Sequence, residues 1–154
     1  MTRALTALLA MAPIAQQAYA QEHRDADFRV SDIEARLLYE QTGTLSVDLS
    51  DHPEFAAWNT IIGAGSALEN ANDLLVSAVI EGPGQHNLET PLVITVRDAD
   101  GKTIATRTVA GMLTETKTVR SIILYDVGCA GLLSLEARLG RSMRAEEIWL
   151  PCGE

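Results

Sequence analysis

The stretch PLVITVRDADGKTIATRTV, residues 91–109, decides the fold class of this chain. Residues 91–97 are aliphatic and β-branched, and residues 102–109 return with a second β-branched run. The four residues between them, from Asp98 to Gly101, have the composition of a tight turn. The segment therefore predicts an antiparallel hairpin. Its Asp98-x-Asp100-Gly101 sequence is interpreted as the turn and not as the opening of a calcium loop.

Further strand-like segments flank this hairpin on both sides. Glycine-rich breaks separate them at intervals of about 10 to 20 residues, as is typical of an all-β domain. The additional predicted strands cover residues 72–80, 116–127, 131–139 and 145–152. Together these segments predict an antiparallel, immunoglobulin-like β-sandwich of about seven strands.

One segment near the start of the chain is open to two interpretations. Ser31 and Glu34 are spaced as in a capping box, which favours a helix over residues 32–41. Residues 44–50, however, alternate in polarity as a strand would. The apolar positions of that alternation, which we expect on the buried face, are Leu45, Val47 and Leu49. We favour a hairpin of residues 35–41 with 44–50, because an isolated strand needs a partner.

A short helical turn is expected at residues 53–61. Pro53 suits the first turn of a helix, and Phe55 and Trp58 follow at helical spacing. The glycines that come after this segment would end the turn.

The first 20 residues have the features of a secretory signal peptide. Arg3 supplies a positive charge, an apolar run of about 12 residues follows, and Ala18-Tyr19-Ala20 is a small-x-small cleavage sequence. The run is shorter than the roughly 20 residues that span a bilayer. We therefore expect cleavage after Ala20, and a periplasmic or secreted protein that is not inserted in a membrane. The mature chain would have a flexible lead over residues 21–30 and a single β-sandwich domain over residues 31–154.

The two cysteines of the chain are Cys129 and Cys152. An even number of cysteines in an exported chain favours a structural disulfide. Their spacing differs from the Cys-x-x-Cys of redox proteins. A disulfide between Cys129 and Cys152 is therefore predicted, with a stabilising effect of roughly 3 kcal/mol from closing the loop.

The last predicted hairpin admits two registers. A two-residue loop at Gly140-Arg141 pairs residues whose numbers sum to 281, and it places Cys129 opposite Cys152. A four-residue loop over residues 140–143 gives a sum of 283 and packs the apolar residues of the two strands directly against one another. Both registers turn the apolar faces inward, so the sequence leaves the choice open.

The chain is acidic, with 12 basic and 21 acidic residues and a formal net charge of −9. Removal of the signal peptide with Arg3 would make this −10, and the whole excess lies in residues 21–89. Nucleic acid and anionic lipid both require a basic face, so we expect the chain to bind neither. The acidic first half is instead a candidate site for a cation or for a basic partner.

No motif for catalysis or for a cofactor stands out. None of the histidines, His23, His52 and His86, lies in the sequence context of a serine or cysteine nucleophile. The histidines, cysteines and methionines do not have the close spacing of metal ligands, and Gly63-Ala64-Gly65 lacks the lysine of a phosphate loop. We therefore expect no enzyme, no cofactor and no metal centre.

Three aromatic residues are candidates for an interaction surface, namely Trp149, Trp58 and Phe55. Trp149 is out of phase with its apolar neighbours Ile148 and Leu150, so it should lie on the outer face of the last strand. We expect the helical turn that carries Phe55 and Trp58 to cover it.

The sequence thus favours an exported, non-enzymatic β-sandwich that serves as a binding or accessory module for another envelope or extracellular protein. The alternative is a periplasmic protein that binds a ligand or cation with its acidic first half and the loop over residues 50–72.

Overall fold

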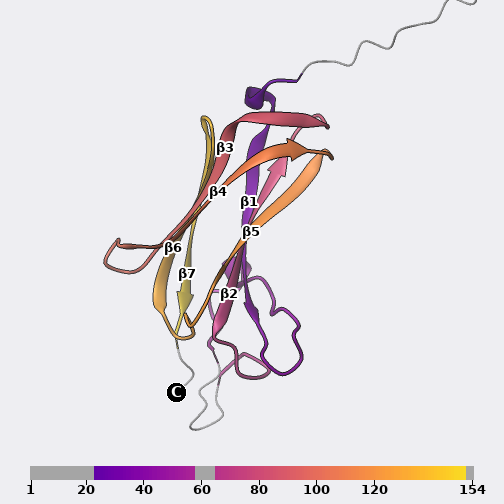
Figure 1. Cartoon of the computed structure of the whole chain (residues 1–154). Coiled ribbons are helices and arrows are strands. Elements are labelled where there is room, and N and C mark those ends of the chain that lie inside the picture. The colour runs from indigo at the N-terminus through magenta and orange to yellow at the C-terminus, as the bar shows by residue number, and fades with distance from the viewer. Residues whose placement is uncertain (1–22, 58–64, 152–154) are drawn as a thin grey trace, which may run out of the picture.

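The computed structural model describes residues 23–57 and 65–151, which form two antiparallel β-sheets packed face to face (Figure 1). One sheet has the strand order β1-β2-β5 and the other has the order β4-β3-β6-β7. The strands are β1 (Arg29–Leu38), β2 (Asp73–Glu81), β3 (His86–Arg97), β4 (Thr103–Leu113), β5 (Lys117–Leu124), β6 (Gly131–Leu139) and β7 (Ser142–Leu150). Three and four strands in two sheets is a division typical of seven-stranded immunoglobulin-like sandwiches. The predicted fold class is confirmed.

The core lies between the two sheets, where every second residue of each strand points inward. The largest side chains that are fully buried there are Ile33, Leu37, Leu74, Ile80, Leu92, Ile94, Leu113, Leu133, Leu135, Leu139, Ile148 and Leu150. These leucines and isoleucines come from six of the seven strands, so burial of their apolar surface holds the two layers together.

The hairpin of β3 and β4 turns where the sequence predicts. The Asp98 carboxylate accepts the backbone N–H groups of Asp100 and Lys102 at 3.0 and 2.9 Å. Gly101 has φ +77°, a conformation that costs a glycine little. The residues of Asp98-x-Asp100-Gly101 therefore serve the turn, as expected.

The hairpin of β6 and β7 has the two-residue loop. Gly131 pairs with Leu150 and Leu139 with Ser142, so every pair sums to 281 and the four-residue alternative is wrong. Gly140 has φ +56°, as the first loop position of a type II′ turn requires. Because this turn needs only two residues, β7 begins at Ser142, three residues before the predicted start.

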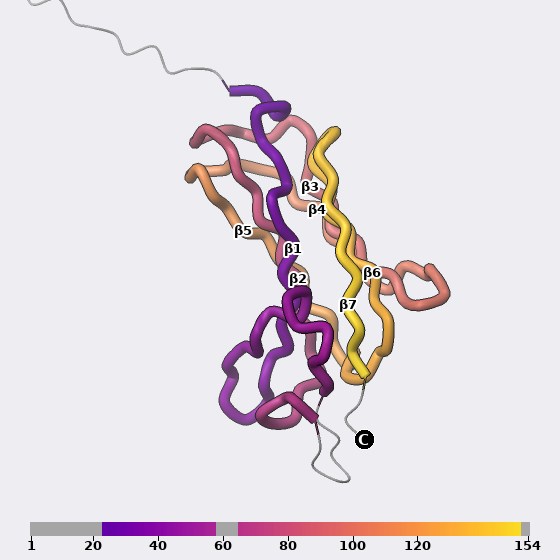
Figure 2. The backbone as a smooth tube through the Cα atoms, turned by 180° about the vertical axis from the view of Figure 1, so that it is seen from behind, coloured from indigo at the N-terminus to yellow at the C-terminus, as the bar shows by residue number. Residues whose placement is uncertain are grey.

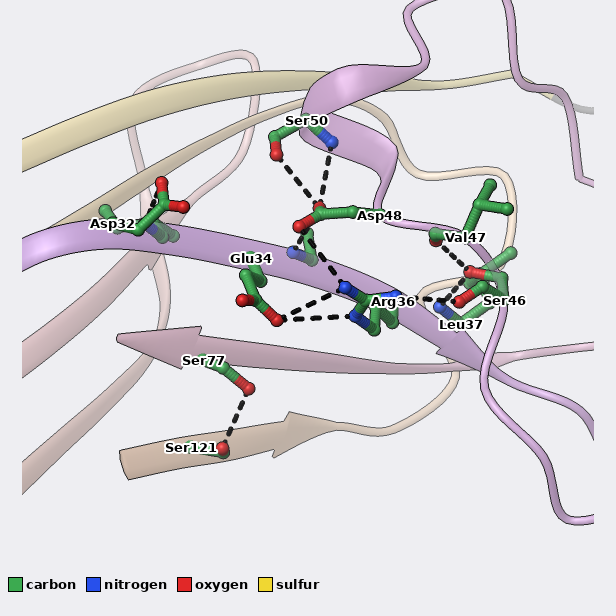
Figure 3. Close-up of polar contacts among 12 residues, drawn as sticks. Asp32, Glu34, Arg36, Leu37, Ser46, Val47, Asp48, Ser50, Ser77 and Ser121 are labelled. Atoms are coloured by element: carbon green, nitrogen blue, oxygen red, sulfur yellow. Dashed lines mark hydrogen bonds and ion pairs between the residues drawn. The ribbon is translucent and has the colours of Figure 1, made fainter. Parts of the chain in front are cut away.

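The free edge of β1 is covered by side chains rather than by another strand. Four of its backbone N–H groups point away from β2, on residues that are almost fully buried. Val30 donates to the Ser142 hydroxyl at 3.0 Å, and Ile33 donates to the Asp32 carboxylate at 2.9 Å. Ala35 donates to the Asp48 carboxylate at 3.0 Å, and Leu37 donates to the Ser46 hydroxyl at 2.9 Å. Figure 3 shows Ser46 and Asp48 turned toward β1 from the segment that runs beside it. A buried N–H without an acceptor is costly, so these side chains replace the missing strand.

This arrangement corrects the predicted hairpin of residues 35–41 with 44–50. Residues 35–38 are strand and not helix, but the main partner of β1 is β2, and residues 44–50 contribute a single bridge between Leu38 and Leu45. The face of the second segment is also the reverse of the prediction. Its polar residues turn toward β1 to accept the N–H groups, so Leu45 and Val47 are 43% and 48% exposed. Leu49 alone of the three apolar positions is buried.

The helical turn predicted at residues 53–61 is wrong where the structure describes it. The chain instead forms two short 3₁₀ turns, η1 (Asp25–Asp27) and η2 (Leu49–Asp51). The Asp48 carboxylate starts η2 by accepting the N–H and the hydroxyl of Ser50 at 3.2 and 2.9 Å. Residues 58–61 lie outside the described residues.

The lead predicted over residues 21–30 contains regular structure in the part that is described. It holds η1 and the first two residues of β1. Phe28 and Val30 are 3% and 6% exposed and belong to the core. The sandwich thus begins before residue 31, because the apolar residues at the start of β1 pack against it.

Asp48→Ala should lower the free energy of unfolding by about 2 kcal/mol, because it leaves the N–H of Ala35 buried without an acceptor. Asp48→Asn keeps one acceptor oxygen and should lose less than about 1 kcal/mol. The measurement is urea unfolding of the three proteins.

Asp51→Ala is the matched control, because Asp51 is exposed and lies on the same turn. It should change stability by less than about 0.5 kcal/mol. Equal losses for Asp48→Ala and Asp51→Ala would show that the acceptors on the β1 edge do not matter.

Candidate functional site

The three aromatic residues predicted to form one surface are not brought together by the structure. As predicted, Trp149 lies on the outer face of β7. It is 55% exposed, so the prediction that a helical turn covers it is wrong. Phe55 is 5% exposed and packs in the core. Trp58 lies outside the described residues. Of the two candidates that the structure describes, Trp149 is the exposed one.

The histidines have two different kinds of environment. His52 is in a turn and its ring nitrogen Nδ1 is 3.2 Å from Glu54 Oε1. His86 is the first residue of β3 rather than a loop residue, and its Nε2 is 2.7 Å from Asp25 Oδ1. His23 contacts the edge of the Phe28 ring.

Cys129 lies between β5 and β6, in a turn where its φ is +61°. Its predicted disulfide partner, Cys152, lies outside the described residues. The pairing therefore stays a prediction.

A groove of about 390 Å³ lies among the loops at the end of the sandwich where β1 ends and β2 begins. Its apolar lining consists of Tyr39, Leu45, Val47, Phe55 and Leu68. Its polar lining consists of Ser46, His52, Glu54 and Ser66. The loops that form it are grouped at the lower end of the molecule in Figures 1 and 2, away from η1. We define these nine residues as the loop groove.

The floor and the rim of the loop groove differ in exposure. Tyr39 and Phe55 are buried against the core and form its floor. Leu45, Val47 and Leu68 are 43%, 48% and 82% exposed and form its rim. Exposed apolar side chains gathered around a hollow are typical of a surface that binds a partner.

The rim of the loop groove follows from the covered edge of β1. Ser46 and Asp48 turn toward that edge, so the alternating residues Leu45 and Val47 must point the other way. The loop between Tyr39 and Thr44 closes through a bond from the Tyr39 N–H to the Thr44 carbonyl at 2.9 Å. The same interaction that protects the sheet edge therefore presents apolar side chains to the surroundings.

The opposite wall depends on a close approach of two backbones. Ser66 donates its N–H to the Ala56 carbonyl at 2.9 Å. Gly65 has φ +137°, and a Cβ there would lie 2.4 Å from the carbonyl oxygen of Ala57. Only glycine fits at this position, which holds Ser66 and Leu68 beside the groove.

Carboxylates lie in and beside the loop groove. Glu54 lines it and Glu69 directly follows its rim residue Leu68, whereas Asp48 is paired with Arg36 at 3.7 Å. The pKa of Glu54 is lowered by its own backbone N–H and by His52. The pKa of Glu69 is lowered by the N–H and the hydroxyl of Thr42. Both carboxylates are therefore ionised at neutral pH.

A second polar cluster lies at the other end of the sandwich and fastens η1 to β3. The Asp25 carboxylate accepts the N–H groups of Glu89 and Thr90 at 3.1 and 2.6 Å, in addition to its contact with His86. The His86 ring stacks on Phe28 with centroids 4.9 Å apart. We call Asp25, Phe28, His86, Glu89 and Thr90 the N-terminal clamp.

Sequence reasoning missed the N-terminal clamp, because 61 residues separate Asp25 from His86. Burial alone would raise the pKa of Asp25. The hydrogen bonds from His86, Thr90 and Glu89 outweigh it and lower the pKa below its ordinary value. A carboxylate that accepts hydrogen bonds from three residues of β3 fastens η1 to that strand.

Two further searches cover the described residues only. No group of three or more histidine, cysteine, aspartate or glutamate side chains in residues 23–57 and 65–151 could hold a metal ion. In the same part of the chain, no helix has the length and apolar character needed to cross a membrane.

The sequence matches no family model and no curated protein. Among solved structures, the chain is similar to the crystal structure of the C-terminal domain of Wzt, with 10% sequence identity and a TM-score of 0.42. The match covers 83% of this chain and 74% of the other.

Asp25→Asn should lower the free energy of unfolding at pH 7 by about 1 to 2 kcal/mol, because hydrogen bonds to a charged acceptor are the stronger ones. A carboxylate whose pKa is lowered by folding contributes stability above its unfolded pKa of about 3.9. That contribution is lost as the pH falls through the lower, folded pKa. The melting temperatures of the two proteins should therefore converge as the pH falls from about 5 toward 2.

Asp27→Asn removes the same charge from an exposed neighbour and is the control. It should leave the pH dependence of the melting temperature unchanged. If Asp25→Asn melts like the parent protein at pH 7, the N-terminal clamp contributes nothing to stability.

Proposed function

We propose that this chain is an exported, non-enzymatic binding or accessory module of the cell envelope, and that it binds a polypeptide segment of another exported protein in the loop groove. The observation that carries this proposal is the apolar rim of Leu45, Val47 and Leu68 around the buried floor of the groove. Apolar side chains that remain exposed around a hollow are best explained by a partner that covers them.

Export and a disulfide belong to the same proposal. The first 20 residues have the composition of a signal peptide. The pairing of β6 with β7 ends at Gly131 and Leu150, in the register whose sum is 281. Two further residues along that register lead to Cys129 and Cys152. This supports a disulfide between them, which would hold the end of β7 beside the start of β6.

The protein recovered after export should have the intact mass of residues 21–154 less two hydrogen atoms. No free thiol should react in denatured, unreduced protein. Reduction should lower the free energy of unfolding by roughly 3 kcal/mol, because the loop between the cysteines is released. Two reactive thiols would contradict the disulfide, and a mass that retains the first 20 residues would contradict cleavage.

The groove itself is tested by photo-crosslinking in the exported protein. A benzoyl-phenylalanine placed at Leu68 should yield one discrete adduct with another protein. Replacing Leu45 and Val47 by serine in the same chain should reduce that adduct by about tenfold, because the rim loses apolar area.

The same cross-linker at Thr106, which is exposed on β4, is the matched control and should yield no such adduct. A third variant of the protein carries the cross-linker at Trp149. An adduct from Trp149 with none from Leu68 would overturn the groove as the site and assign binding to the outer face of β7. Equal labelling at all three positions would show nonspecific contact and would count against the proposal.

A further inference from the structure

We propose that the segment bound in the loop groove is basic, with one or two apolar anchor side chains flanked by lysine or arginine. This inference rests on the proposed function and goes further, because it specifies the chemistry of the partner. Two independent properties of the loop end lead to it, the depth of its apolar part and the sign of its charge.

The apolar part of the loop groove fits a side chain and not a whole helix. A volume of about 390 Å³ accommodates one or two large apolar residues. The Tyr39 hydroxyl, on the floor, accepts the N–H of Leu68 at 3.4 Å, which holds its ring in place. An entering group would meet mainly the apolar surfaces of Leu45, Val47 and Leu68. An aliphatic or aromatic side chain is the group that gains most from such surroundings.

The charge beside the groove is mainly negative. The Arg36 guanidinium donates to the Ser46 carbonyl at 3.4 Å, but it is itself paired with the carboxylates of Glu34 and Asp48. Glu54 lies in the groove, and Glu69 directly follows the rim residue Leu68. The pKa of each is lowered by local hydrogen bonds, which keeps both carboxylates ionised. An anionic partner would be repelled, whereas a cationic one would be attracted and oriented.

The carboxylates surround the apolar hollow instead of lining its floor. Among the lining residues only Glu54 is acidic, and it is 74% exposed. Glu69 belongs to a different loop, where it is held by Thr42 at 2.7 and 3.0 Å. A ligand that satisfies both needs an apolar group in the middle and positive charges beside it. A short stretch of polypeptide has that distribution, and a compact organic cation does not.

The test uses three synthetic peptides and the exported protein. The first has the sequence Lys-Lys-Leu-Trp-Leu-Lys-Lys, the second replaces each lysine by glutamate, and the third replaces the apolar centre by Ser-Gly-Ser. The first should bind at least about tenfold more tightly than either of the others, measured by fluorescence anisotropy at low salt. Its affinity should fall as the salt concentration rises, because the attraction between exposed charges is screened.

Two variants separate the contributions. Leu68→Ser should weaken the first peptide by about tenfold, since an apolar contact of the rim is lost. Glu54→Gln combined with Glu69→Gln should weaken it several-fold and flatten its salt dependence. Ile104→Ser removes an exposed apolar side chain from β4 and should leave binding unchanged.

The outcomes distinguish this inference from the proposed function. If the acidic peptide binds as well as the basic one and Leu68→Ser weakens both, the groove is a binding site but its partner is not basic. If no peptide binds while cross-linking at Leu68 still gives its adduct, the inference fails and the proposed function stands. If neither peptide binding nor cross-linking depends on the groove residues, both are overturned.

Discussion

The four N–H groups along the open edge of β1 impose the constraint on which the rest of the structure depends. They belong to residues that are almost fully buried, so water cannot accept them. Because β1 is the edge strand of its sheet, no further strand lies beside it to accept them either. Side chains from three directions do so instead, from β7, from β1 itself and from the segment after Thr44. The bond from Val30 to Ser142 also joins the two sheets at the side where β1 and β7 lie next to one another (Figure 2). The hydrogen bond from Val30 to Ser142 therefore both protects the edge of β1 and holds the two sheets together.

The features that the sequence predicts well are local. The turn at Asp98–Gly101 depends on side chains within a few positions, and alternation fixes which residues of β6 face the core. Six of the seven strands follow from the same signals, whereas β1 overlaps a segment that the sequence leaves open between helix and strand. Local information also leaves the register at Gly140 open, because both loops keep the apolar faces inward.

The features that the sequence missed are long-range. Residues 44–50 alternate in polarity, and hydrophobicity alone assigns Leu45 and Val47 to the core, whereas both are exposed. The requirement for acceptors at Ala35 and Leu37 reverses that assignment, and it becomes apparent only once β1 is known to be an edge strand. The loop groove was invisible to the sequence for the same reason. Phe55 lies in the core although no helix surrounds it, because a loop can also bury an aromatic ring.

The two polar clusters give the ends of the sandwich different characters. The N-terminal clamp is a compact set of hydrogen bonds around one carboxylate, with an aromatic ring stacked on its histidine. The other end has exposed apolar residues, carboxylates in and beside its groove and walls made of loops. Regular structure that carries binding loops at one end is a common division between scaffold and recognition surface.

Because the N-terminal clamp and the loop groove lie at opposite ends of the sandwich, the point at which the protein is fused to a carrier decides whether the groove stays accessible. A carrier fused ahead of residue 23 would emerge beside η1, at the end of the sandwich far from the loops (Figure 1). The end of β7 lies near the loops, where the Pro151 carbonyl accepts the N–H of Ala57 at 2.9 Å. A carrier fused there would sit close to Leu45, Val47 and Leu68. If the protein is immobilised through the η1 end, the loop groove faces away from the support. If it is immobilised through the end of β7, the support lies next to the groove and obstructs it.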